Sequence, residues 1–400
     1  MSFSRPYSPR RLQPGSRPGG FSLVEIMVGM VIGMLGIIVM MQIFALAEGQ
    51  KRATTGGGDA QNNGAIALYG VQRDIRQAGW GNSDLKMIGC DVLLPTTRSA
   101  AAPPAVTLNP LAPVTINHPG IPAGDANTDT LLVVYGNTNG TPQGDGFVAA
   151  NATANIFQVQ TPTSFIVNDW VIAIARNRPA QPASCGTILD RVNCIGIACA
   201  APVPSAANIV VATGAVVNTL LGGVPSATLY NLGQAPKILA YAIRNGNLTL
   251  CDYMANDCAA AGNVGNSAIW VPIGSNIVSM RAQYGRDTTV LPAPATVTMD
   301  GIVDIYDQTS PDLQTANNVA PAPTTGCGWA RISAIRLVLV ARSGQYEKTQ
   351  VTAAAPAWLG SAATPIDLSG YADWQNYRYK IFQTVVPIRN IAWLGAQTGC

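Results

Sequence analysis

The chain has 400 residues, a formal net charge of +3 and only 11% charged residues, although 48% of its residues are hydrophobic. Soluble proteins usually carry about 25% charged residues, so the polar surface of this chain must come from Asn, Thr, Ser, Gln and Gly. Its 40 Gly and 28 Pro are typical of many turns between short strands, and no basic stripe points to nucleic acid. The composition favours a secreted or extracellular β-rich domain over a cytosolic enzyme or a nucleic-acid-binding protein.

The N-terminal region combines a basic leader with a long apolar run. Residues 1–20 contain four arginines, four prolines and no acidic residue, and the prolines disfavour a helix. Residues 26–47 are 22 positions with Gln42 as the only polar side chain. A helix of that length spans about 33 Å, enough to cross a hydrocarbon core of about 30 Å. Positive charge before the span predicts a cytoplasmic N-terminus and places the rest of the chain across the membrane.

Three kinds of N-terminal segment are compatible with this pattern. An ordinary secretory signal would be cleaved after Ala45-Leu46-Ala47, which resembles a small-x-small cleavage site. However, the apolar run of such a signal is usually about 7–15 residues long, and Glu25 precedes the run here. An uncleaved signal anchor explains the span but gives no role to Glu25 or to the glycine–aromatic junction at residues 19–21. The third kind is a prepilin signal.

Residues 19–25 (GGFSLVE), followed at once by the apolar run, resemble the processing motif of type IV prepilins and type II secretion pseudopilins. The resemblance implies a membrane prepilin peptidase that cleaves between Gly20 and Phe21 on the cytoplasmic side and then N-methylates Phe21. Glu25 would become the fifth residue of the mature chain. The motif is specific, because a glycine, an aromatic residue and a glutamate stand at fixed spacing before a membrane span.

Glu25 is expected to act in assembly. A carboxylate in a membrane helix costs about 2.5–3.5 kcal/mol at the bilayer centre and less near an end, so it is seldom without a function. Phe21 and Glu25 are four residues apart and share a helix face. In the family, the terminal amine of one subunit is held to pair with this glutamate of a staggered neighbour. The alternative is an interfacial glutamate that only orients the helix.

Gly29 and Gly33 form a G-x-x-x-G pair within the apolar run. Such a pair permits close helix packing, although glycine is also common in membrane helices that lack this role. Both interpretations remain open for these two residues.

A helix is expected over residues 21–79, with its first half in the membrane and its second half packed on the globular domain. The glycine cluster at 56–58 should weaken it, because each glycine costs about 1 kcal/mol relative to alanine. Beyond the cluster an amphipathic stripe resumes at 3–4–3 spacing, and the glycines at 79 and 81 are expected to end the helix. The stripe consists of Leu68, Val71, Ile75 and Ala78.

Residues 81–400 are expected to form a β-rich domain. Apolar runs predict buried strands at 130–135, 170–175 and 209–212. Asn245-Gly246 predicts a hairpin between two further strands, because Asn-Gly is the strongest short turn signal. The hairpin strands are expected at 237–244 and 247–253, the remaining strands at 270–284, 332–341 and 377–388, and loops at 95–124, 200–207 and 291–298.

All cysteines follow the apolar run, and their number is even. They are Cys90, Cys185, Cys194, Cys199, Cys251, Cys258, Cys327 and Cys400. None forms a C-x-x-C pair, and the chain has a single histidine, so disulfides in an oxidising compartment are favoured over a zinc site. The only pairing suggested by the sequence is Cys251–Cys258, which closes a short loop.

Several later segments resemble the PilW group of minor pilins, which is related to the J-type pseudopilins of type II secretion. These segments are RDIRQAGW (73–80), DTLLVVYG (129–136), NIVSMRAQYGRD (276–287), ISAIRLVLVARS (332–343) and YRYKIFQTVVPIRN (377–390). The resemblance implies a low-abundance subunit that joins other minor pilins, primes pilus assembly and lies at the pilus tip. Its expected partners are the prepilin peptidase, the other minor pilins, the major pilin and the inner-membrane assembly platform.

No catalytic or metal site is expected. The lone His118, interpreted as a surface residue, leaves no Ser–His–Asp set. Asp125, Asn127 and Asp129 resemble the start of an EF-hand loop, but Thr130 stands where glycine is required and no glutamate follows at the twelfth position. A turn before the 130–135 strand explains these residues more simply. The same caution applies to Asp300, Asp304 and Asp307.

The chain also contains no nucleotide-binding motif, so a partner ATPase must supply the energy of assembly. No enzymatic activity, cofactor, metal or nucleic-acid partner is therefore expected.

These observations predict an α+β, pilin-like fold with a long N-terminal helix packed on a large, disulfide-stabilised β-rich domain. The protein is expected to be a single-pass inner-membrane minor pilin with a cytoplasmic N-terminus and a periplasmic domain, later found in the pilus. One alternative is a J-type pseudopilin of a type II secretion system. Another is a tip adhesin that binds surfaces or DNA, which an exposed aromatic or basic groove would favour.

Overall fold

The computed structural model describes residues 20–151, 156–175, 186–196, 199, 209–212, 227–289, 299–311 and 325–395. The chain divides into two compact units, Met1–Thr55 and Gly56–Cys400. The helix α1 (Leu23–Gln77) contributes residues to both units, and the described strands belong to the second. As the sequence predicts, an apolar N-terminal helix is followed by a large β-rich domain with several sheets.

The apolar run is exposed along its whole length. Large hydrophobic side chains from Leu23 to Leu46 lie on the surface, and no part of the most apolar stretch of α1 is buried. Among the described residues, α1 is the helix that is long and apolar enough to cross a membrane. A continuous apolar surface of this kind marks an interaction with lipid or with other protein, which is consistent with a single-pass membrane protein.

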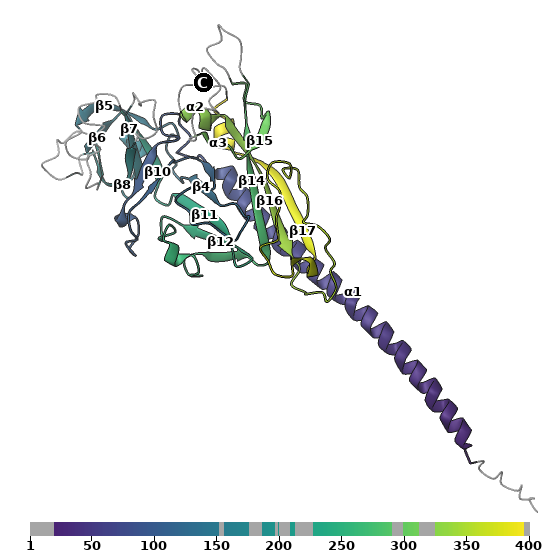
Figure 1. The fold of residues 1–400 in the computed structure, drawn as a ribbon. Helices are drawn as coiled ribbons and strands as arrows, with labels where there is room; N and C mark the ends of the chain where they lie inside the picture. The colour runs from purple at the N-terminus through teal and green to yellow at the C-terminus, as the bar shows by residue number, and fades with distance from the viewer. Residues whose placement is uncertain are drawn as a thin grey trace, which may run out of the picture. The chain divides into compact units, whose positions relative to one another are not determined.

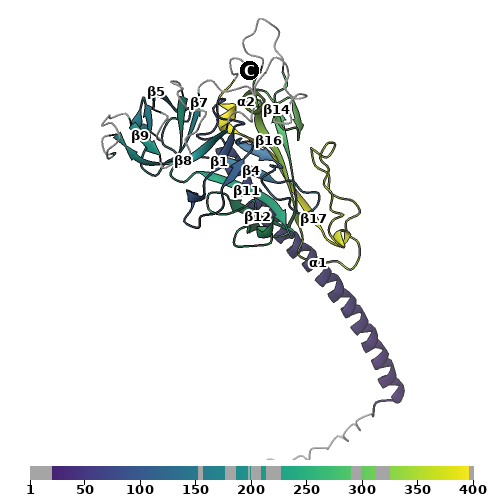
Figure 2. The same ribbon diagram turned by 60° about the vertical axis from the view of Figure 1, so that its left-hand side comes forward.

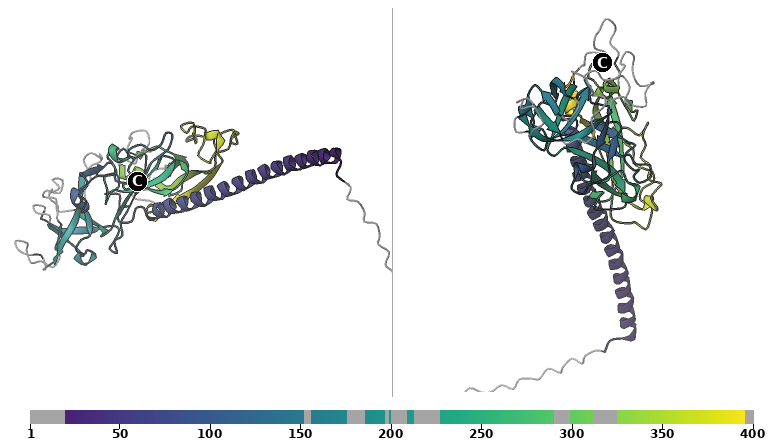
Figure 3. Two further views of the ribbon diagram at one scale, coloured as in Figure 1. Left: turned by 90° about the horizontal axis from the view of Figure 1, so that it is seen from below. Right: turned by 90° about the vertical axis from the view of Figure 1, so that its left-hand side faces the viewer.

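The glycine cluster at residues 56–58 does not interrupt α1, which continues to Gln77 (Figure 3). Tertiary packing supports the helix at this point, because a Cβ on Gly56 would lie 3.3 Å from the Gln345 side chain and 3.4 Å from that of Ser343. The helix ends before Gly79, whose φ of 87° is in the left-handed region that favours glycine.

The main core of the second unit is built from α1 and two antiparallel sheets (Figure 1). The amphipathic stripe of α1 enters this core as expected: Val71, Ile75 and Ala78 are fully buried and Leu68 is partly buried. The five-stranded sheet has the order β13-β12-β11-β4-β3 and the four-stranded sheet the order β15-β14-β16-β17. The bounds are β3 Val114–Ile116, β4 Leu131–Tyr135, β11 Lys237–Arg244, β12 Asn247–Asp252, β13 Val271–Gly274, β14 Ile277–Arg286, β15 Ile305–Asp307, β16 Ile332–Arg342 and β17 Tyr379–Pro387.

Two tight turns shape these sheets. Asn245 and Gly246 join β11 to β12 and both have positive φ, so the predicted hairpin is confirmed. The single strand expected at 270–284 is wrong, because the chain reverses at Asn276, which has a φ of 55°, and β13 and β14 belong to different sheets. Asparagine tolerates this left-handed conformation better than most residues, and the apolar pattern gave no sign of the break.

A six-stranded antiparallel ring is inserted between β4 and β11, which are direct neighbours in the five-stranded sheet. Its strands pair in the order β8-β7-β10-β5-β6-β9, and β9 pairs back onto β8 (Figure 2). The ring encloses a separate apolar core that includes Phe165, Val171 and Leu229. The bounds are β5 Asp145–Asn151, β6 Ile156–Val159, β7 Trp170–Ala175, β8 Gly186–Ile195, β9 Ile209–Ala212 and β10 Ala227–Gly233. The expected strands at 170–175 and 209–212 are therefore confirmed.

The segment 95–124, expected as a loop, contains short ordered elements. These are the 3₁₀-helix η1 (Thr96–Arg98) and the strands β2 (Val106–Leu108) and β3. β2 pairs with β1 (Asp91–Leu94), which itself pairs in parallel with β8. Pairing and burial of Leu108 and Val114 override a composition rich in Pro, Ala and Thr. The expected loops at 200–207 and 291–298 lie outside the described residues.

The remaining described helices are short. They are η2 Pro162–Ser164, η6 Ala261–Asn263, α2 Thr325–Ala330, η8 Trp374–Asn376 and α3 Arg389–Ala392.

Disulfides join Cys251 to Cys258, the pair suggested by the sequence, and Cys194 to Cys199. Cys90 and Cys327 are also disulfide-bonded. Cys185 and Cys400 lie outside the described residues.

Candidate functional site

The N-terminal candidate residues lie at the start of α1. Gly20, Phe21 and Ser22 precede the helix, and Glu25 is in its first turn. Glu25 is exposed and forms no hydrogen bond or ion pair within the described part of the chain. The helix dipole favours a carboxylate in the first turn by only about 0.3–1 kcal/mol. A counter-ion for Glu25 is thus not supplied by the residues that the structure describes.

Gly29 and Gly33 leave an open surface on the same helix. Apart from the adjoining residues and backbone of the helix itself, no atom of the described chain lies within 4 Å of the position that a Cβ would take at either residue. Residues 20–47 therefore present an exposed helix face and a carboxylate without a counter-ion among the described residues.

A second candidate residue, Asp74, was not singled out by the sequence patterns. Its carboxylate is 2% exposed and accepts hydrogen bonds from the hydroxyls of Tyr241 on β11 (2.5 Å) and Tyr135 on β4 (3.3 Å). Burial, reinforced by Asp74, raises the pKa of both tyrosine hydroxyls well above the usual range, so both remain donors. The available signal was an acid between Val71 and Ala78 on an otherwise apolar stripe.

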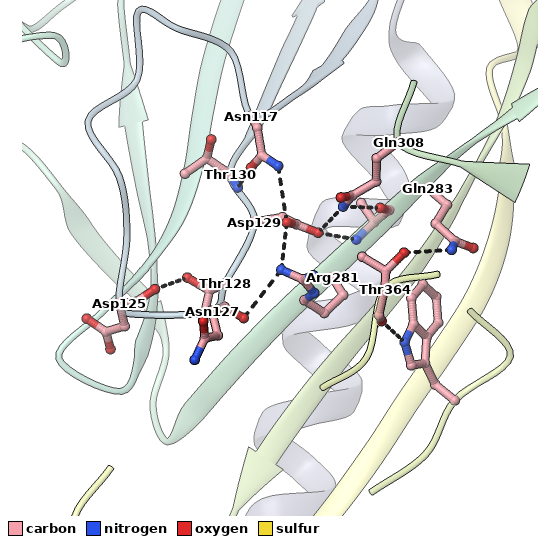
Figure 4. Close-up of polar contacts among 12 residues, drawn as sticks. Asn117, Asp125, Asn127, Thr128, Asp129, Thr130, Arg281, Gln283, Gln308 and Thr364 are labelled. Atoms are coloured by element: carbon pink, nitrogen blue, oxygen red, sulfur yellow. Dashed lines mark hydrogen bonds and ion pairs between the residues drawn. The ribbon is translucent and has the colours of Figure 1, made fainter. Parts of the chain in front are cut away.

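Asp129 is the centre of a buried polar network (Figure 4). Its carboxylate is 2% exposed and receives four donors: Arg281 Nη1 (2.9 Å), Ala282 N (2.9 Å), Asn117 Nδ2 (3.2 Å) and Gln308 Nε2 (2.6 Å). Burial raises the pKa of Asp129, and Arg281 with the neutral donors opposes that rise. The carboxylate joins the loop before β4 to strand β14.

Asp125 and Asn127 face different partners from Asp129. Asp125 accepts hydrogen bonds from Asn245 N (2.9 Å), Gly246 N (2.7 Å) and Tyr371 Oη (2.7 Å), so it caps the β11–β12 turn. Asn127 donates to Asp367 (2.8 Å). No group of three His, Cys, Asp or Glu side chains in the described residues could hold a metal ion. The EF-hand-like spacing therefore has a structural explanation, because protein donors occupy both carboxylates.

The acids at 300–307 are also engaged locally. Asp304 accepts hydrogen bonds from Thr288 N (2.7 Å) and Thr289 Oγ1 (3.2 Å), and Asp307 pairs with Arg286 across β14 and β15. These contacts close the β14–β15 connection, as turn-forming acids do.

The family model of PilW, described as type IV pilus-assembly protein W, matches residues 241–390. This match supports a component of type IV pilus assembly. Comparisons with curated proteins and with solved structures returned no match. Residues 241–390 are called the PilW segment below.

The PilW segment runs from β11 through β17 into α3, whereas α1, β4 and the inserted ring lie outside it. Two buried carboxylates connect it to the rest of the second unit. Asp74 on α1 binds Tyr241, and Asp129 before β4 binds Arg281. Asp74 and Asp129 thus hold the second unit together, whereas the candidate residues of the exposed apolar part of α1 make no such contacts within the described chain.

His118 is buried, and its interpretation as a surface residue is wrong. The side chain is 2% exposed, and its Nδ1 accepts a hydrogen bond from Gly120 N (2.9 Å). That bond requires an unprotonated Nδ1. Burial lowers the pKa of His118 to about 4, against the opposing effect of the Pro110 carbonyl.

This environment predicts a loss of stability in acid. The unfolded chain takes up a proton on His118 below the usual histidine pKa of 6.5, whereas the folded chain does so only near 4. The folded state should therefore lose about 1.4 kcal/mol per pH unit between these values, about 3 kcal/mol in total. Urea unfolding of the full-length protein in detergent measures this slope. His118→Asn keeps an acceptor near the position of Nδ1 but does not titrate. This variant should reduce the slope of the unfolding free energy against pH by the equivalent of about one proton. Equal slopes for the variant and the wild type would contradict a buried neutral imidazole.

Proposed function

We propose that the protein is a minor-pilin-like structural subunit, not an enzyme, that helps to prime type IV pilus assembly and is placed at the pilus tip. The observation that carries the proposal is the exposed apolar helix with Glu25 in its first turn, directly after the Gly20–Phe21 junction. The PilW segment supports a subunit of a pilus system over a J-type pseudopilin of a type II secretion system. The pilin-like fold and membership of the prepilin superfamily belong to the same proposal.

In this proposal residues 1–20 are a cytoplasmic leader, residues 26–47 cross the inner membrane once, and residues 81–400 are periplasmic before they enter the pilus. Disulfides among the described cysteines suit an oxidising compartment. The prepilin peptidase would remove the leader, and other minor pilins, the major pilin and the assembly platform would contact the mature helix.

The physical basis is the pairing of charges in a medium of low dielectric constant. Glu25 has no counter-ion within the described residues, and cleavage after Gly20 creates an amine four residues before it. Axial stagger between neighbouring helices brings the amine of one subunit to the carboxylate of another, where water does not screen their attraction. Gly29 and Gly33 would allow those helices to approach closely.

The N-terminal mass of the protein isolated from native membranes tests this proposal. We expect a chain that begins with N-methylated Phe21 in cells with the prepilin peptidase and with Met1 in cells without it. A start at Glu48 would identify an ordinary secreted protein and overturn the proposal. An intact Met1 in both strains would also overturn it, leaving a membrane-anchored β-rich domain.

A further inference from the structure

Two cavities adjoin in the second unit, and the smaller one lies next to the C-terminal end of α1. The larger has a volume of about 560 Å³ and the smaller about 330 Å³, and Asn137 and Thr138 line both. Asn137 and Thr138 directly follow β4, where the chain enters the inserted ring. The cavities therefore share one wall and differ in the chemistry of the other walls.

The larger cavity is lined mainly by hydroxyl and amide groups. Among the described residues that line it, Asp169 is the one charged side chain and none is basic. Asp169 is buried and is held by Asn231 Nδ2 (2.7 Å) and Ile166 N (2.9 Å), which fixes that wall. Asn139 and Thr163 also line the cavity, and their side chains form no hydrogen bond with described residues. These groups are ready to bind the hydroxyls of a ligand.

The smaller cavity is aromatic and basic. Trp80, Tyr135 and Trp393 line it together with Arg76 and Arg389, and no acidic side chain does so among the described residues. Trp393 is 75% exposed, an unfavourable position for an indole in water. Neither arginine forms an ion pair within the described part of the chain, so both guanidinium groups are available to an anion.

Hydrogen bonds fix the walls of the smaller cavity. Trp80 Nε1 donates to the Thr138 carbonyl (3.0 Å). Asn390 Nδ2 donates to the carbonyl of Gln77, the last residue of α1 (3.1 Å), and to that of Ala78, which follows it (2.9 Å). This bond holds α3, and with it Arg389, against the end of α1. Such preorganisation lowers the entropic cost of binding.

We propose that the two cavities together bind an oligosaccharide that carries an acidic sugar. The carboxylate of that sugar would pair with Arg76 and Arg389, and its ring would stack on Trp393. Neutral sugars would extend into the larger cavity, where Asn139 and Thr163 bind their hydroxyls. The site goes beyond pilus assembly and does not depend on it.

The observations favour this ligand over single-stranded nucleic acid. A nucleic acid carries a phosphate at every residue and requires a positively charged track along its backbone. The larger cavity offers no basic side chain among its described lining and contains the Asp169 carboxylate. A ligand with its negative charge confined to one end matches the two cavities, because their described arginines line only the smaller one.

Most residues of this site lie outside the PilW segment. Arg76, Trp80, Asn139 and Thr163 precede residue 241, and Trp393 follows residue 390. Arg389 and Asn390 lie within that segment, so the site combines matched residues with residues that the family model does not match.

Binding of the full-length protein, in detergent, to an array of acidic and neutral oligosaccharides tests the proposal. The array includes sialyllactose and lactose, which differ only in the acidic sugar, and a single-stranded oligonucleotide. We expect at least one acidic oligosaccharide to bind more tightly than its neutral counterpart. Arg389→Gln should weaken acidic ligands about tenfold, the loss expected for a charged hydrogen bond, and leave neutral ones unchanged. Trp393→Ala should weaken both classes.

Lys348→Gln is the matched control, because it removes one exposed positive charge outside the cavities and should leave binding unchanged. Asn139→Ala should weaken ligands with neutral sugars beyond the acidic one. The proposal is overturned if no acidic oligosaccharide binds, if Arg389→Gln and Trp393→Ala bind like the wild type, or if the oligonucleotide binds more tightly than every oligosaccharide.

Discussion

Glu25→Ala is expected to reduce the amount of this subunit in sheared surface pili at least about tenfold, because a charge pair worth about 1.4 kcal/mol or more changes an equilibrium tenfold. The substitution removes the carboxylate that would receive the terminal amine of a neighbouring subunit. The level of the protein in the membrane should not fall, because the exposed Glu25 side chain forms no hydrogen bond or ion pair within the described chain. Quantitative immunoblots of pili and membranes measure both quantities.

The matched control for this experiment is Asp59→Ala. Asp59 is an exposed acid of the same helix, α1, and lies beyond the apolar run, so its loss should leave incorporation unchanged. Glu25→Asp keeps the charge and shortens its reach by one methylene group, and an intermediate effect is expected. If Glu25→Ala enters pili as well as the wild type does, the carboxylate only orients the helix.

Asp129→Asn is expected to destabilise the second unit by about 3–5 kcal/mol, the usual cost of breaking a buried ion pair. The amide leaves the partly buried Arg281 without its counter-charge and turns an NH₂ group toward other donors, including Gln308 Nε2 at 2.6 Å. The urea midpoint of the full-length protein in detergent measures this loss. Asp373→Asn makes the same chemical change at an exposed position with a φ of 53°, which asparagine tolerates, and should stay within about 0.5 kcal/mol.

The double variant Asp129→Asn/Arg281→Gln separates the contribution of the Asp129–Arg281 ion pair from that of the other hydrogen bonds of the network. If the cost comes from the uncompensated charge of Arg281, the double variant should be more stable than the sum of the two single losses implies. A loss below about 1 kcal/mol for Asp129→Asn would show that the network of Figure 4 is not a tightly buried one.

Several parts of the fold could be predicted because they depend on local sequence. The apolar run, the stripe of α1 and the Asn245-Gly246 turn are each encoded within a few residues, since helix periodicity and turn conformation are short-range properties. The Cys251–Cys258 pair joins residues only seven apart. The strand expected at 270–284 failed for a local reason too, because the chain turns at Gly274-Ser275-Asn276, where Asn276 adopts a left-handed conformation within an otherwise apolar run.

The candidate N-terminal segment was predictable for the same reason, because its composition and motif lie within residues 19–47. The partner of this segment is not encoded in the same way. An exposed helix face with a Glu25 that lacks a counter-ion among the described residues indicates that the segment binds another molecule, but it does not identify that molecule. The assembly role of Glu25 is therefore predicted from the resemblance to prepilins, and the Glu25→Ala variant tests it.

By itself, the sequence determined an apolar helix long enough to span a membrane, the β11–β12 hairpin, the strands β16 and β17 and the short disulfide loop. Only the tertiary structure decided which polar residues are buried. Asp74 meets Tyr241 across 167 positions and Arg281 meets Asp129 across 152. Likewise, the closure of the six-stranded ring and the shared wall of the two cavities depend on strand pairings between distant segments. Such contacts depend on the packing of the whole domain, which no local pattern of residues encodes.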